Sequence, residues 1–150
     1  MGSSFWLSGT TRWLLRVITA AGLAVDAYLH WQLAPDFDSL VGTGSPQISQ
    51  GQLFRLEAVL ALIALLLVLT TRHRSAAACA FVIAAGGLAA LLLYGYVEVG
   101  AIGPLPDMYD PVWSTGKILS AVAEAVAAVA ALCLFLIPAP EQRQVAPPVD

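Results

Sequence analysis

The sequence has very little charge. Only 11% of its 150 residues are Asp, Glu, Lys or Arg, whereas about 25% is usual in a soluble domain. The formal net charge is −3, so the chain lacks the basic surface that a nucleic-acid partner requires, and no nucleic acid is expected. Apolar residues take the place of charge and make up 59% of the chain. This composition and length predict one all-α domain over 1–150, a polytopic integral membrane four-helix bundle.

Signatures of known catalytic centres are also missing. The two cysteines, Cys79 and Cys133, both lie in apolar runs and form no CxxC pair. This placement favours buried small side chains over a redox pair, which needs reactive thiols near water. No nucleotide-binding loop, Ser-His-Asp set or zinc motif occurs. The sequence therefore predicts no catalytic residue, favours a protein that is not an enzyme, and names no cofactor.

Four long apolar runs are present. Each has about 20 residues or more, enough to cross a hydrocarbon layer of ~30 Å. Backbone groups in lipid must be paired within their own segment, so each run is expected to be a helix. The proline-rich end, 138–150, cannot continue the last helix and is expected to be a disordered cytoplasmic tail. The expected helices cover about 13–33, 53–71, 76–99 and 112–137.

The basic residues predict the orientation in the membrane. With four crossings, Arg12, Arg16, Arg72, Arg74 and Arg143 fall on one side. The positive-inside rule then places both termini in the cytoplasm of a bacterial-type inner membrane, with several passes. The two long loops, which carry several aspartates, face outward.

Ionisable side chains nevertheless lie inside these spans. A charge at the centre of a membrane helix costs about 2.5–3.5 kcal/mol on insertion scales unless it is paired or hydrated. At about 1.5 Å per residue, all of them fall in the outer half or at its boundary, while the inner half is nearly pure Ala, Leu, Val and Ile. If the polar helix faces converge, they form an outward-facing polar pocket. Its candidate ligand-binding residues are Asp26, His30, Glu57, Tyr94, Glu98, Lys117 and Glu124.

Two interpretations of these residues stay open. In the first they form buried ion pairs that fix helix register. Asp26 pairs with His30 one turn away, and Lys117 pairs with Glu124 or Glu57. In the second the pocket binds a lipid-like or quinone-like molecule in the outer leaflet. Proton or cation movement is disfavoured because the inner half offers no polar path.

A metal centre is not predicted from the sequence. His30 and three carboxylates have the donor types for a hard or borderline cation. Di-iron bundles, however, use Glu-x-x-His motifs on facing helices, and no such motif occurs here. Asp26 and His30, four residues apart, are only a weak signal.

One stretch carries a family resemblance. In "LLRVITAAGLAVDAYLHWQLA", Arg16 precedes Gly22 in a first helix whose outer end is polar. Together with the four-span layout and cytoplasmic termini, this resembles small bacterial membrane proteins of the DoxX-like type. Where that family often closes the helix with Gly-x-x-Lys, this chain has Asp26 and His30. The resemblance implies a four-helix membrane architecture. Members of that family are associated, as accessory subunits, with quinone-linked redox or stress roles, but only the architecture is carried over to this chain.

The sequence thus predicts a small membrane protein of unassigned activity. We expect an accessory or structural subunit with an outward-facing polar pocket. The alternative is an outer-leaflet binding site or enzyme for a lipid-like or quinone-like molecule. Expected partners are the lipid bilayer and either another membrane protein or a second copy of this chain.

Overall fold

A computed structural model describes residues 9–137, and its regular elements are all helices. The order is α1 (Gly9–Leu33), the short 3₁₀ helix η2 (Ala34–Phe37), α2 (Gln50–Thr70), α3 (Arg74–Tyr96) and α4 (Thr115–Leu136). Within the described range there is no β-strand, only two isolated bridges. The predicted all-α class and the four helices are therefore confirmed for this range. The predicted tail, 138–150, lies outside the described residues.

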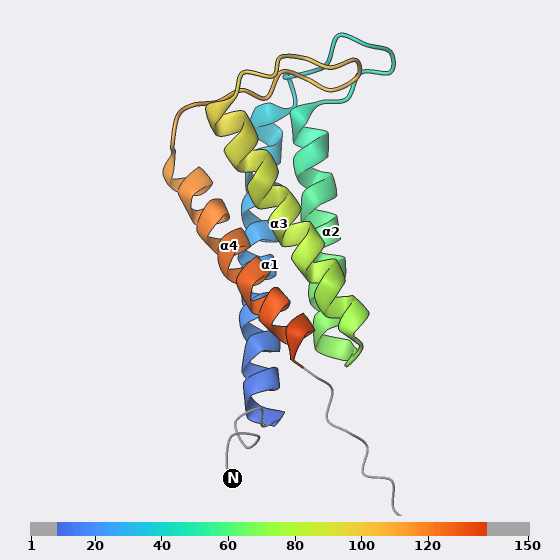
Figure 1. The fold of residues 1–150 in the computed structure, drawn as a ribbon. Helices are drawn as coiled ribbons and strands as arrows, with labels where there is room; N and C mark the ends of the chain where they lie inside the picture. Colours follow the sequence, from blue (N-terminus) through green and yellow to red (C-terminus); the bar gives the residue numbers. More distant parts are fainter. Residues whose placement is uncertain (1–8, 138–150) are drawn as a thin grey trace, which may run out of the picture.

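The four helices run alternately up and down (Figure 1). α1 packs against α2 and α4, α3 packs against α4 and less extensively against α2, and α1 and α3 barely touch. The bundle therefore has a ring order, in which α1 and α3 are diagonal neighbours. The long loops lie at one end, which we call the outer end, and the tight α2–α3 turn lies at the other, which we call the inner end (Figure 1).

Side-chain caps explain where two helices begin. Ser49 accepts a hydrogen bond from the Gln52 backbone N–H, and the Gln52 side chain accepts one from the Ser49 N–H. This capping box satisfies two otherwise unpaired donors, so α2 begins three residues before the predicted position. Ser114 caps α4 by accepting from the Lys117 N–H, and α4 begins three residues later than predicted. α3 ends at Tyr96, short of the predicted residue 99.

The interior of the bundle is built from small residues, and the large apolar side chains face outward. Leu66, Val82 and Val129 are each more than half exposed. A water-soluble monomer rarely exposes such a surface, whereas small residues at helix contacts are typical of membrane bundles. The fully buried alanines include Ala58, Ala61 and Ala64 on α2, Ala77, Ala80 and Ala84 on α3, and Ala127 and Ala131 on α4.

Three helices of the described range, α2, α3 and α4, are long and apolar enough to cross a membrane. α1 is not among them, because Arg12, Arg16, Asp26 and His30 lower its hydropathy. The membrane class is thus supported by three helices. The fourth crossing and the orientation of the termini stay predictions.

The two long loops interlock across the outer end. The Gly44 N–H donates to the Gly103 carbonyl at 2.8 Å, and the Ile48 N–H donates to the Pro104 carbonyl at 3.0 Å. A Cβ atom on Gly44 would lie 2.8–2.9 Å from the Gly103 backbone, so only glycine fits there. We call segments 38–49 and 97–114 the outer loop layer. It joins the α1–α2 hairpin to the α3–α4 hairpin at the end of the bundle nearer to the predicted pocket residues.

Candidate functional site

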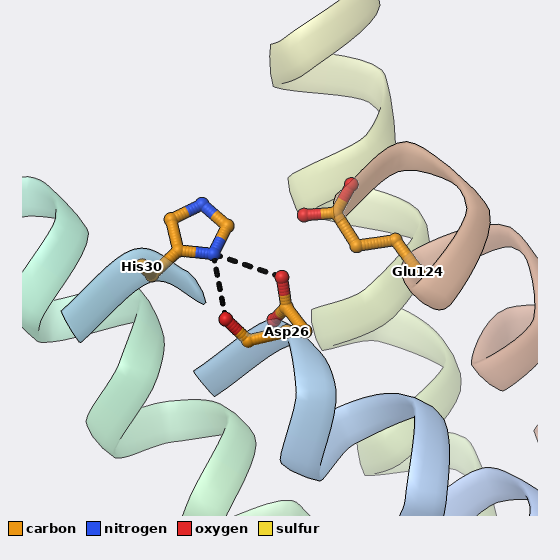
Figure 2. Close-up of side chains that lie close together, drawn as sticks. All are labelled: Asp26, His30 and Glu124. Atoms are coloured by element: carbon orange, nitrogen blue, oxygen red, sulfur yellow. Dashed lines mark hydrogen bonds and ion pairs between the residues drawn. The ribbon is translucent and has the colours of Figure 1, made fainter. Parts of the chain in front are cut away.

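Asp26 and His30 lie one helical turn apart on the buried face of α1. His30 Nδ1 is 2.8 Å from Asp26 Oδ1 and 3.1 Å from the Asp26 carbonyl oxygen (Figure 2). The predicted Asp26–His30 pair is therefore confirmed. Asp26 is 0% exposed. The His30 ring packs edge-on against Phe54 of α2, with ring centroids 5.2 Å apart, and this contact holds the imidazole against the bundle.

Two carboxylates from other helices reach the same place. Glu124 of α4 is only 1% exposed, and its carboxylate lies across from His30 and Asp26 in Figure 2. Glu57 of α2 lies beside it. A Cβ atom placed on Gly87 of α3 would be 2.6 Å from Glu124 Oε1 and 3.2 Å from Glu57 Oε1. The missing side chain of Gly87 therefore leaves room for both carboxylates. We call Asp26, His30, Glu57 and Glu124 the carboxylate–histidine cluster.

Five of the six carboxylate oxygens of this cluster are buried and form no hydrogen bond with the described residues. Both oxygens of Asp26, both oxygens of Glu124 and Oε1 of Glu57 form no hydrogen bond with the described residues, although His30 Nδ1 lies at ion-pair distance from Asp26 Oδ1. No Lys or Arg of the described residues forms an ion pair with them. Native interiors seldom leave buried polar atoms unpaired, and carboxylates this close repel one another strongly when ionised. With all three acids ionised, His30 alone would not balance their charge.

The spacing of the cluster suits a metal ion. Asp26, His30 and Glu124 each offer one ligand atom, and these atoms all lie within 4.8 Å of one another. Ligand bonds of about 2.0–2.2 Å place neighbouring donors roughly 3 Å apart and opposite donors a little over 4 Å apart. One imidazole nitrogen and carboxylate oxygens are donors that first-row divalent metals accept. The sequence pattern did not show this arrangement, because Asp26 and His30 share α1 whereas Glu124 comes from α4.

The other predicted pocket residues lie outside the cluster. Lys117 forms its ion pair with Asp110 of the outer loop layer, Nζ to Oδ2 at 3.4 Å, and its Nζ also donates to the Asp110 carbonyl oxygen. The predicted pairing of Lys117 with Glu124 or Glu57 is therefore wrong. Asp110 lies closer than either glutamate because Lys117 sits in the first turn of α4, directly below the loop.

Tyr94 and Glu98 are also separated from the cluster. The Tyr94 carbonyl accepts a hydrogen bond from the Asp110 N–H, so Tyr94 belongs to the contact between α3 and the outer loop layer. Glu98 is exposed, because α3 ends two residues before it. The sequence predicts Glu98 inside a helix that continues to residue 99, whereas α3 ends at Tyr96.

Two residues of the expected pocket, Asp26 and Glu124, are almost fully buried, at 0% and 1% exposed. Two clefts are found at the opposite end of the bundle, and none of the seven predicted pocket residues lines them. Gly87, which sequence reasoning did not place in the site, contributes by its lack of a side chain. The only sequence signal for it was the Gly86-Gly87 pair inside an apolar run.

This chain matches no protein-family model, no curated protein and no solved structure. The resemblance to DoxX-like proteins therefore stays an expectation from the sequence.

Proposed function

We propose that this chain is a four-span integral membrane protein that binds one divalent metal ion within the outer half of its bundle. The ligands are Asp26, His30 and Glu124, with Glu57 as a fourth donor beside them. One observation carries the proposal: five buried carboxylate oxygens without a hydrogen bond gather where three ligand atoms lie close enough to share a single ion.

A bound cation balances the negative charge of the cluster better than ion pairs that fix the helix register would. Such pairs need a base for each acid, and His30 is one base for three acids. The other nearby bases are used elsewhere, since Lys117 is held by Asp110 and Arg55 is held by Asp38. A buried charge is tolerated when it is paired or coordinates a metal. A divalent ion supplies two positive charges where the three carboxylates meet, and it offers each carboxylate a bond.

The donor set favours a borderline first-row ion. Carboxylates together with imidazole suit Mn²⁺, Fe²⁺ and Zn²⁺, whereas soft Cu⁺ prefers sulfur ligands. Cys79 and Cys133 are not part of the cluster. Because the interior on the inner side of the cluster is built mainly of alanine, we propose a resident metal rather than an ion in transit.

Metal binding by the purified full-length chain tests this function. Protein in a mild detergent is stripped with a chelator and dialysed against Zn²⁺, and bound zinc is measured by elemental mass spectrometry. We expect one Zn²⁺ per chain. Glu124→Gln and Asp26→Asn should each weaken binding at least about tenfold, because each removes one anionic ligand.

Glu98→Gln is the matched control, since it makes the same chemical change at an exposed glutamate outside the cluster. It should leave both stoichiometry and affinity unchanged. Helicity measured by circular dichroism shows whether each variant is folded. Zinc binding that is absent in folded wild-type protein, or equal in Glu124→Gln and Glu98→Gln, would contradict the proposal.

A further inference from the structure

A cleft at the inner end of the bundle is lined by arginines and apolar side chains together. It has a volume of about 270 Å³ and lies between the first turns of α1 and the last turn of α2. We call it the basic cleft. Its lining residues are Trp13, Arg16, Val17, Leu69, Thr70 and Arg72.

The arginines of the basic cleft have no acidic partner. Neither Arg16 nor Arg72 forms an ion pair with any described residue. Arg16 Nε donates to the Val68 carbonyl at 2.7 Å, and its Nη2 donates to the Leu69 and Thr71 carbonyls. These bonds fix the guanidinium in place, and no acidic side chain of residues 9–137 forms an ion pair with it. Arg72 is exposed in the α2–α3 turn and lies near enough to repel Arg16 electrostatically.

The uncapped start of α3 adds to the positive potential. His73 occupies the N-cap position but its side chain forms no cap hydrogen bond. A second cleft, which shares Arg16 and Arg72 with the basic cleft, reaches His73, Arg74 and Ala76 at this helix start. Free backbone N–H groups and the helix dipole favour an anion at such a terminus. The backbone at the start of α3 therefore adds positive potential beside Arg16 and Arg72, whereas the Arg74 side chain lines only the second cleft and not the basic cleft.

The apolar part of the basic cleft faces the side of the bundle. Trp13 is 62% exposed, Leu69 49% and Val17 37%. These side chains lie where acyl chains would surround a membrane bundle. A free phosphate ion would use the arginines and leave this apolar surface unused, whereas a phospholipid would use both. Basic pockets between transmembrane helices on the cytoplasmic side are suited to anionic headgroups.

We propose that the basic cleft binds the headgroup phosphate of an anionic phospholipid, with Arg16 and Arg72 contacting the phosphate. Trp13, Val17 and Leu69 contact the upper part of an acyl chain. The site is separate from the carboxylate–histidine cluster, at the other end of α1. It requires only that the bundle is embedded in a bilayer.

Quenching of Trp13 fluorescence tests this site. Purified full-length protein in detergent is titrated with phosphatidylglycerol brominated on its acyl chains, and in parallel with brominated phosphatidylcholine. We expect saturable quenching by phosphatidylglycerol and weak quenching by phosphatidylcholine. Trp13→Phe should remove the saturable part. Arg72→Gln should weaken it about fivefold to tenfold, because one charge-assisted contact to phosphate is lost.

Arg74→Gln is the matched control. Arg74 lies at the same end and carries the same charge, but its guanidinium sits 4.7 Å from the Phe135 ring centre and its Nε donates to the Phe135 carbonyl. This variant should leave the saturable quenching within about twofold of wild type. Equal weakening by Arg72→Gln and Arg74→Gln would overturn the proposal, because it would indicate diffuse attraction to a charged surface.

The choice of lipid and a free anion separate the remaining alternatives. Equal quenching by the two brominated lipids would also overturn the proposal, since it would remove the role of headgroup charge. Inorganic phosphate is the third arm of the titration. If low millimolar phosphate displaces the lipid and chloride does not, the ligand of the cleft is free phosphate. That result would overturn the proposal of a phospholipid site.

Discussion

α1 and α3 are diagonal neighbours in the bundle, and of the two only α1 buries polar side chains among its small and apolar ones. The buried residues of α3 are four alanines and Gly95. Those of α1 include Thr19 and Asp26, both 0% exposed. α3 is one of the helices that are long and apolar enough to cross a membrane, and α1 is not.

This difference shows that α1 depends on its neighbours for its polar groups. The Arg16 guanidinium donates to carbonyls at the C-terminal end of α2, where the helix dipole is negative. Thr19 donates to the Leu15 carbonyl one turn earlier in its own helix. Asp26 and His30 meet Glu124 of α4. The buried polar groups of α1 therefore meet partners inside the bundle, and these contacts can be tested one by one.

The largest expected effect on stability comes from adding a side chain at Gly22, where α1 packs closely against α4. A Cβ atom on Gly22 would lie 2.8 Å from the Ala123 carbonyl oxygen and 2.9 Å from Ala127 Cβ. The α4 backbone would have to shift, so Gly22→Ala should lower the free energy of unfolding by about 1–3 kcal/mol. Denaturant titration in mixed micelles measures this change.

The matched control for that change lies on α3. A Cβ atom on Gly86 would meet nothing within 4 Å, so Gly86→Ala should be neutral or stabilise the helix by up to about 1 kcal/mol. Equal destabilisation by Gly22→Ala and Gly86→Ala would mean that α1 is no more tightly fitted than α3.

A smaller effect is expected at the inner end of α1. Arg16→Gln removes hydrogen bonds from a charged donor to α2 carbonyls, and should cost about 2 kcal/mol of unfolding free energy. Arg72→Gln removes the same charge from an exposed turn residue and should change stability by less than about 0.5 kcal/mol. The same titration compares the two variants. Equal losses would show that positive charge at this end, and not the contact to α2, stabilises the bundle.

The smallest effect on stability is expected in the outer loop layer just after η2, at Asp38. Arg55 donates two hydrogen bonds to Asp38, at 2.6 and 2.7 Å, and these lower the pKa of the Asp38 carboxyl. A lowered folded-state pKa gives stability that is present above the unfolded-state pKa and is lost as the pH falls through the folded-state value. Asp38→Asn should therefore reduce slightly the loss of thermal stability between about pH 7 and about pH 2.5.

Asp36 is the control for this pH dependence. It lies in η2, two residues before Asp38, and forms no ion pair with the described residues. Asp36→Asn measured at the same two pH values should leave the dependence as in wild type. If Asp36→Asn reduces the pH dependence of thermal stability as much as Asp38→Asn does, the Asp38–Arg55 pair is not its cause.

Much of the fold could be predicted because apolar run length decides where these helices lie. The predicted and observed helices overlap over nearly their whole length, and local caps account for two of the shifted ends. The Ser49–Gln52 capping box and the Ser114 cap move helix ends without changing the apolar pattern. The interlocking of Gly44 with Gly103 could not be predicted, since it joins residues far apart in the sequence.

The site was predictable in part for a similar reason. Depth in the membrane and the i,i+4 spacing brought Asp26, His30, Glu57 and Glu124 to one level, and the structure joins them. Lys117 was misassigned because its partner, Asp110, lies in a loop whose path the helix pattern does not specify. The space left by Gly87 depends on how α3 is rotated against α2 and α4. An apolar helix that has no polar side gives no sequence signal for how it is rotated about its own axis.

The interlocked loops have a consequence for how the chain could be divided. The α1–α2 hairpin and the α3–α4 hairpin are joined covalently through the short turn after Thr70. They are also joined through backbone hydrogen bonds at the far end, between 44–48 and 103–104. The peptide link at the turn is therefore one of several connections. If the two hairpins were made as separate peptides, each would still carry its half of these loop hydrogen bonds. The chain can therefore be regarded as two hairpins that could associate without the peptide link.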